Sequence, residues 1–240
     1  MKFYESGDNR KPVIFLFPGT CCLYNSFDHV LDGLYSYFYT VAVSYDGFDP
    51  NEKTEFYSME DECEKIEQEI RTKYGGRIKA AYGCSLGGSF VSLLIQRKRI
   101  HIDHGIIGSS DMDEAGSFMA KLQSSIIVPI MYKMVHTGKL PKFTQNKINE
   151  ADESRKKLID GFVNMFGIDK GGSPWITKQS VYNQFYSDLV TKVQHGIDVP
   201  GTTIHVFYAT KMGEKYEKRY CTYFKNPDIR RHNMQHEELF

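Results

Sequence analysis

The sequence predicts an α/β fold: a mostly parallel, open sheet that is flanked by helices and carries a helical insertion. Three observations predict it. Short apolar or β-branched runs alternate with longer helical patterns through the first half of the chain. The run at 13–17 is continuously apolar, as in a strand buried on both faces. Residues 114–195 show helical periodicity, and strand character returns at 204–208. We therefore expect a core of residues 1–113 and 196–240, with residues 114–195 inserted as a cap.

The composition is that of an ordinary globular protein. Of 240 residues, 41% are hydrophobic and 25% charged, which excludes a disordered chain and fits one domain with an inserted subdomain. Lys and Arg number 30, as do Asp and Glu, so no positive excess favours nucleic acid. The apolar runs are too short for a signal peptide or a membrane-spanning helix. Five cysteines without a C-x-x-C pair favour a reducing, cytoplasmic location.

Local patterns predict each element in turn. A strand at 13–17 ends at Pro18-Gly19, and a β-branched and aromatic strand at 39–45 ends at Asp46-Gly47. Ser58-Met59-Glu60-Asp61 is a capping box, and Gly75-Gly76 ends the helix that follows it. The other expected elements are a helix at 27–37, a strand at 78–82, a helix at 87–97, a weaker strand at 104–108, helical apolar faces at 158–166 and 181–193, and a short strand near 228–230.

The segment Gly83-Cys84-Ser85-Leu86-Gly87-Gly88 contains a G-x-S-x-G motif between a predicted strand and a predicted helix. The turn must be sharp, so small residues flank the serine and its hydroxyl stands exposed at the carboxyl end of the sheet. Because a helix begins there, its dipole and the Leu86 N–H face any negative charge that develops. The motif indicates a nucleophilic serine. The alternative is a glycine-rich turn that only packs a helix on a strand.

With this motif in place, the chain resembles the α/β-hydrolase superfamily over nearly its whole length. The resemblance implies a catalytic triad in the chain order Ser, acid, His, and an oxyanion loop after the first apolar strand. That strand leads here into Pro18-Gly19-Thr20-Cys21-Cys22, where many members have a His-Gly pair. The donors in such a loop are backbone N–H groups, so Pro18 need not abolish it. We expect donors from Leu86 and from Thr20 or Cys21; the alternative is a simple strand-end turn.

The resemblance also implies that the general base is a histidine beyond the last strand. Met234-Gln235-His236-Glu237-Glu238-Leu239 matches the closing pattern of family members, with Gln235 in place of a glycine. His236 is therefore the expected base, and His232 is the alternative.

The acid departs from the family pattern. Family members place it after the penultimate strand, where the matching position here is Met212. Glu214, beside Gly213, is the first candidate, and its use would require the preceding residues to loop outward. Asp111, at the end of the preceding strand, and Glu217 are the others. A carboxylate at any of these positions could orient the histidine and stabilise its imidazolium.

These residues predict a serine hydrolase that cleaves a carboxylic ester of a small-molecule acyl substrate through an acyl-enzyme on Ser85, without a cofactor. The sequence carries no zinc-protease motif, no phosphate-binding loop and no Cys/His cluster with metal-ligand spacing. Two alternatives stay open: a binding protein on this fold with a degraded triad, and an acyltransferase on the same scaffold. The resemblance implies that residues 114–195 carry the substrate specificity. The acyl length, the preference among ester, thioester and amide, and the oligomeric state stay open.

Overall fold

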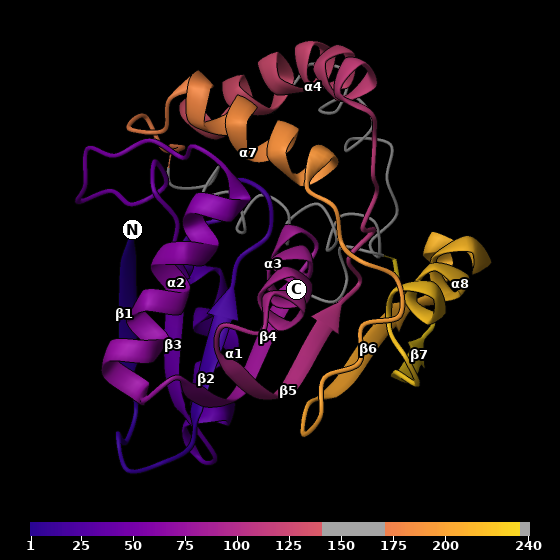
Figure 1. The fold of residues 1–240 in the computed structure, drawn as a ribbon. Coiled ribbons are helices and arrows are strands. Elements are labelled where there is room, and N and C mark those ends of the chain that lie inside the picture. The colour runs from indigo at the N-terminus through magenta and orange to yellow at the C-terminus, as the bar shows by residue number, and fades with distance from the viewer. Residues whose placement is uncertain (141–170, 236–240) are drawn as a thin grey trace.

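The computed structural model describes residues 1–140 and 171–235, which contain one seven-stranded sheet flanked by helices (Figure 1). The strand order is β1-β3-β2-β4-β5-β6-β7. Strand β1 runs antiparallel to β3, and all other neighbours are parallel. The strands are β1 Lys2–Ser6, β2 Val13–Phe17, β3 Tyr39–Ser44, β4 Arg77–Cys84, β5 His101–Gly108, β6 Thr203–Ala209 and β7 Asp228–His232. The predicted fold class is confirmed.

Helices cover both faces of this sheet, and the alternation of side chains along β2 shows how. Phe15 and Phe17 point into the larger core cluster with the apolar faces of α2 and α3, whereas Ile14 and Leu16 point into a smaller cluster under α1. This explains why the strand is continuously apolar. The helices are α1 Asp28–Tyr35, α2 Met59–Tyr74, α3 Leu86–Arg97, α4 Ser117–Thr137, α7 Lys178–Val190 and α8 Glu214–Tyr223, with short 3₁₀ turns η1 Tyr24–Phe27 and η2 Thr210–Met212.

The capping box sets the limits of α2 as predicted. The Ser58 hydroxyl accepts a hydrogen bond from the Asp61 N–H at 3.1 Å. At the other end Gly75 takes a left-handed conformation with φ 65° and closes the last turn on Ile70. This helix therefore begins and ends at the residues that the sequence indicates.

Two elements were not predicted, and both are short and polar. Strand β1 has the sequence KFYES and pairs only with β3 at the sheet edge, so it shows no apolar run. Helix α8 begins at Glu214, for which the sequence analysis predicted no element, after Gly213 with φ 106°. The predicted apolar face at 158–166 lies outside the described residues.

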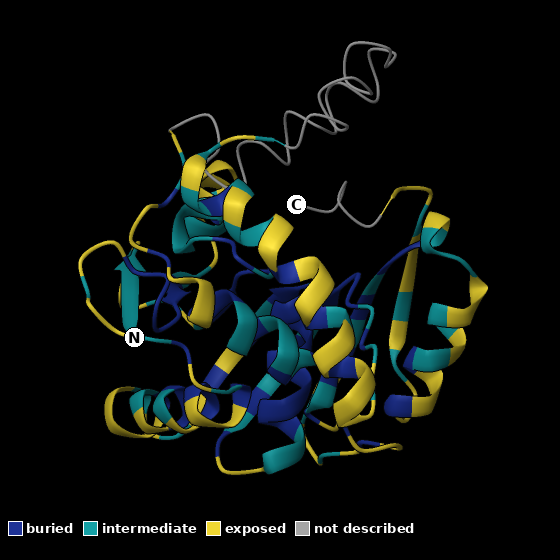
Figure 2. Ribbon diagram, turned by 90° about the horizontal axis from the view of Figure 1, so that it is seen from above, coloured by how far each residue is buried: buried dark blue, intermediate teal, exposed yellow. Residues whose placement is uncertain are grey.

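Helices α4 and α7 pack against each other above the carboxyl ends of the strands (Figure 1). Seen from above, buried residues gather at the centre of the molecule and exposed residues line the outer sides of the helices (Figure 2). Among the described residues, no helix is long and apolar enough to cross a membrane.

Candidate active site

Ser85 occupies the sharp turn between β4 and α3. Its backbone has φ 53° and ψ −123°, a conformation that residues other than glycine rarely adopt. The Ser85 N–H donates to the carbonyl of Gly108 on β5 at 3.0 Å, which ties the turn to the neighbouring strand. The side chain is half-buried. A serine held in this way at the carboxyl edge of a sheet can present its hydroxyl to a ligand.

The glycines of the motif are required by close backbone approaches around this turn. A Cβ at Gly83 would lie 2.0 Å from the Gly87 carbonyl oxygen. A Cβ at Gly87 would lie 2.1 Å from the carbonyl oxygen of Phe17, at the end of β2. These contacts bring the start of α3 against the strand that precedes the predicted oxyanion loop. As the first residue of α3, Leu86 has no acceptor for its N–H within the helix.

The segment after β2 forms a tight turn beside Ser85. The Cys22 N–H donates to the Gly19 carbonyl at 3.1 Å, and Cys21 between them has φ 60°. This matches a type II turn, whose third position requires positive φ. Thr20 is half-buried, and no acceptor among the described residues receives its N–H. Among the described residues, the Thr20 N–H in this turn is therefore available to a ligand.

Cys21 differs from Thr20 because its backbone N–H is already paired. That N–H donates to Oε1 of Gln184 on α7 at 2.8 Å, and both residues are buried. Burial raises the pKa of the Cys21 thiol to about 12, so the thiol is neutral near pH 7. Of the two predicted loop donors, Thr20 has the free N–H.

The three candidate acids lie in different surroundings. Glu214 is exposed at the start of α8. Glu217 is paired with Arg231, whose Nε donates to its carboxylate at 3.2 Å. Asp111 is half-buried in the loop after β5, the strand that holds Ser85 through Gly108.

Helix α8 holds the loop that carries Asp111. The Tyr220 hydroxyl donates to the Ser110 carbonyl at 2.5 Å. The Arg219 guanidinium donates to the Asp111 carbonyl and to the Asp113 carboxylate. The Ser110 hydroxyl lies 3.3 Å from that of Ser89, one helical turn beyond Ser85. Of the three candidate acids, Asp111 is therefore the one whose neighbour, Ser110, contacts the helix that follows Ser85.

His232 is the last residue of β7, and its ring packs edge-on against Phe207 with centroids 5.8 Å apart. Phe207 lines a pocket on the sheet face rather than the carboxyl edge. His236 lies outside the described residues. The described chain before it runs past the end of β6, where the Thr210 hydroxyl donates to the His232 carbonyl at 3.2 Å and the Lys211 N–H donates to the Met234 carbonyl at 3.2 Å.

Helix α7 adds an acidic group that the sequence analysis missed. Half-buried Asp188 accepts a hydrogen bond from the Ser89 hydroxyl and lies near enough to Asp111 for the two charges to interact. Burial raises the pKa of Asp188 to about 7; the Asp111 charge adds to the rise and Ser89 opposes it. The available signal was the row of polar residues Ser180, Gln184 and Asp188, four apart beside the apolar face of the same predicted helix.

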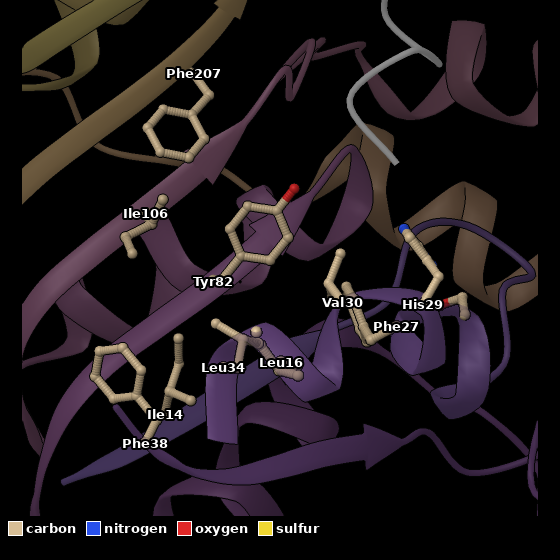
Figure 3. A pocket seen from close by; sticks show the side chains of 12 residues that line it. Ile14, Leu16, Phe27, His29, Val30, Leu34, Phe38, Tyr82, Ile106 and Phe207 are labelled. Atoms are coloured by element: carbon tan, nitrogen blue, oxygen red, sulfur yellow. The ribbon is translucent and has the colours of Figure 1, made fainter. Parts of the chain in front are cut away.

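A separate pocket of about 570 Å³ opens on the sheet face covered by α1 (Figure 3). Phe27, Val30 and Leu34 face Tyr82 and Phe207 across it (Figure 3). Its walls carry no carboxylate and a single histidine, His29. Ser85 is not part of its lining, so we place the candidate active site at the serine turn and not in this pocket. Within the described ranges, no group of three or more His, Cys, Asp or Glu residues could hold a metal ion.

Comparison with known proteins finds structural relatives only. No family model and no curated protein sequence matches the chain. An alpha/beta hydrolase family protein from Desulfitobacterium hafniense aligns with a TM-score of 0.74 at 14% identity, covering 96% of this chain and 90% of that one. The enol-lactonase from Burkholderia xenovorans LB400 aligns with a TM-score of 0.70 at 12% identity, covering 99% and 89%.

A thermophilic esterase from Thermogutta terrifontis aligns with a TM-score of 0.65 at 16% identity, covering 96% of this chain and 82% of that one. Each alignment extends over nearly the whole of both chains. The sheet order, the strand–serine–helix turn and these alignments agree: the chain has the fold of the α/β-hydrolase superfamily.

Proposed function

We propose that this protein is a serine hydrolase that cleaves carboxylic esters of small acyl substrates through an acyl-enzyme. The observation that carries the proposal is Ser85 itself, a serine with φ 53° between β4 and α3. Such backbone strain persists only where the surrounding structure imposes it, and here it places a hydroxyl beside the N-terminus of a helix. The esterase and lactonase activities in the names of two structural relatives are consistent with this chemistry.

In the proposed mechanism, the Ser85 hydroxyl attacks the ester carbonyl while His236 accepts its proton. His236 then protonates the leaving alcohol, and water attacks the acyl-enzyme with the same histidine as base. The N–H groups of Leu86 and Thr20 stabilise the oxyanion of each tetrahedral intermediate. We propose residues 114–195 as the cap that selects the acyl group. The free N–H of Thr20 is the reason to prefer it over Cys21.

We propose Asp111 as the acid that orients His236, ahead of the first sequence candidate, Glu214. Asp111 is half-buried in a loop that α8 holds beside the nucleophile helix. A half-buried carboxylate interacts with an imidazolium more strongly than an exposed one, because water screens it less. The carboxylate of Glu214 is exposed.

The test is turnover of p-nitrophenyl esters together with labelling by a fluorophosphonate. Wild-type protein should show both, and Ser85→Ala should lose both. Ser92→Ala is the matched control, because Ser92 lies buried on α3, the helix that follows Ser85, and its hydroxyl donates to the Gly88 carbonyl at 2.7 Å. Labelling that survives Ser85→Ala would refute the nucleophile. A folded wild-type protein without turnover or labelling would favour the binding-protein alternative, and acyl transfer to added alcohols in preference to water would indicate an acyltransferase.

A further inference from the structure

Helix α7 carries a polar row, buried at Ser180 and Gln184 and half-buried at Asp188, that contacts three parts of the core. Ser180 accepts a hydrogen bond from the Phe56 N–H at 3.3 Å, Gln184 accepts one from the Cys21 N–H at 2.8 Å, and Asp188 accepts one from Ser89. The middle contact joins the layer above the sheet directly to the loop that we assign as the oxyanion loop. A Gln side chain buried at such a place is costly unless its polar atoms are used.

The orientation of the Gln184 amide is fixed by its partner. A backbone N–H can only donate, so the amide must present Oε1 to Cys21 and turn Nε2 away. Nε2 is buried and finds no acceptor among the described residues. One half of the amide therefore works as an acceptor while the other half is left unpaired. That pattern is poor for stability and so points to a role for the contact itself.

The contact holds a strained residue. Cys21 has φ 60°, a conformation that side chains other than glycine disfavour, and the turn is anchored on its other side by the Tyr45 hydroxyl, which donates to the Pro18 carbonyl at 3.2 Å. Cys21 is fully buried, whereas its neighbour Thr20 is half-buried. The hydrogen bond to Gln184 fixes the peptide that follows Thr20, and the hydrogen bond from the Cys22 N–H to the Gly19 carbonyl closes the same turn. Together they restrict the preceding peptide, which carries the Thr20 N–H.

We infer that Gln184 is a positioning residue: from helix α7 it accepts the Cys21 N–H and thereby aims the Thr20 N–H at the developing oxyanion. The inference rests on the proposed hydrolase function. A neutral amide suits this task, because a Glu at the same place would add negative charge close to where negative charge forms. The layer above the sheet then takes part in the chemical step through the loop as well as covering the site.

The test compares Gln184→Met with Asn183→Ala in the full chain. Gln184→Met keeps the side-chain volume and removes the acceptor. The variant loses the unpaired donor Nε2 and gains another unpaired donor, the Cys21 N–H. Its thermal midpoint should therefore stay within about 3 °C of the wild-type value. Asn183→Ala removes the adjacent contact of α7, in which Nδ2 donates to the Phe56 carbonyl at 2.7 Å, and leaves the oxyanion loop untouched.

For Gln184→Met we expect kcat on a p-nitrophenyl ester to fall about 10- to 100-fold, with KM within about twofold, because an oxyanion donor acts in the transition state. The affinity for a trifluoromethyl ketone, which forms an oxyanion on the serine, should weaken by the same factor. Asn183→Ala should keep both within about twofold. Gln184→Glu should approach wild-type kcat at low pH, where the side chain is a neutral acid, and lose activity relative to wild type as pH rises.

Unchanged kcat and ketone affinity in Gln184→Met would overturn the inference while leaving the proposed function intact. So would an increase in kcat, which would mean that Gln184 blocks a donor that substrate must reach. Absence of turnover and labelling in wild type would instead refute the proposed function, and the role of Gln184 with it.

Discussion

At the scale of single residues, the sequence locates the strand–serine–helix turn better than it locates the proposed partners of Ser85. Ser85 is identifiable because the two motif glycines are sterically required. A Cβ at Gly83 would lie 2.0 Å from a backbone oxygen, and one at Gly87 would lie 2.1 Å from another. The acid has no such local rule, since any carboxylate that the fold brings near the histidine can serve. The polar contacts of α7 depend on packing between segments far apart in the chain, such as Cys21 and Gln184. Local patterns therefore could not predict them.

The choice of acid gives a prediction at this scale. If Asp111 orients His236, Asp111→Asn should lower kcat by about 10³- to 10⁴-fold with little change in KM, because an amide can hydrogen-bond but cannot stabilise the imidazolium. Glu214→Gln should stay within about threefold of wild type. Steady-state kinetics on one p-nitrophenyl ester, with thermal midpoints to verify folding, measure both.

The opposite ranking, with Glu214→Gln crippled and Asp111→Asn near wild type, would return the acid to the first sequence candidate. Glu217→Gln is the third variant to compare in the same assay, because the Glu217 carboxylate is paired with Arg231. Its loss should affect kcat least, because the carboxylate is already paired at the surface.

At the scale of elements, strands and helices with a buried stripe or a clear cap are predicted well. Strand β2 and helix α2 have the limits that an apolar run and a capping box indicate. Strand β4 was predicted too short, because Gly83 and Cys84 belong to the strand as well as to the motif. Helix α8 was missed because its sequence, EKYEKRYCTY, buries only Tyr220 and Tyr223 and so lacks a wide apolar face.

Helix α7 yields a prediction about pH. The folded protein raises the pKa of Asp188 from 3.8 to about 7, so it binds this proton more tightly than the unfolded chain does. The contribution of this proton to the free energy of unfolding is fully present below about pH 4, declines as the pH rises and is lost above about pH 7. The full difference is at most about 4 kcal/mol. Asp188→Asn cannot ionise, so it should be more stable than wild type near pH 8 and close to wild type near pH 4.

Denaturant unfolding at about pH 4 and about pH 8 measures this difference. Asp198→Asn is the control, because Asp198 is exposed and pairs with Lys225 at the surface, where such pairs contribute little. An Asp188→Asn variant that is no more stable than wild type near pH 8 would contradict the prediction.

At the scale of the whole molecule, the sheet and the α4–α7 layer differ in how they are held. Strand β4 lies in the middle of the sheet, and apolar side chains on both of its faces are buried. Helix α4 buries only Ala120, Ser124, Val128 and Val135 of its 21 residues. Helix α7 buries Val181 and Leu189 and contacts the core through hydrogen bonds as well. Water can replace hydrogen bonds more readily than it can replace apolar packing, so the layer should open before the sheet unfolds.

Hydrogen exchange should therefore separate the two parts of the fold. Amides in the middle of β4 should exchange only through global unfolding, while those of α7 should exchange at least about 100-fold faster after correction for intrinsic rates, which corresponds to an opening about 2.7 kcal/mol less costly. Raising the pH from about 5 to about 8 should widen the gap further, because the charge of ionised Asp188 is repelled by that of Asp111. Equal protection of α7 and β4 would mean that the layer and the sheet form one cooperative unit. Substrate would then have to reach Ser85 without opening of the layer, and Gln184 would hold the oxyanion loop permanently instead of only while α7 is docked.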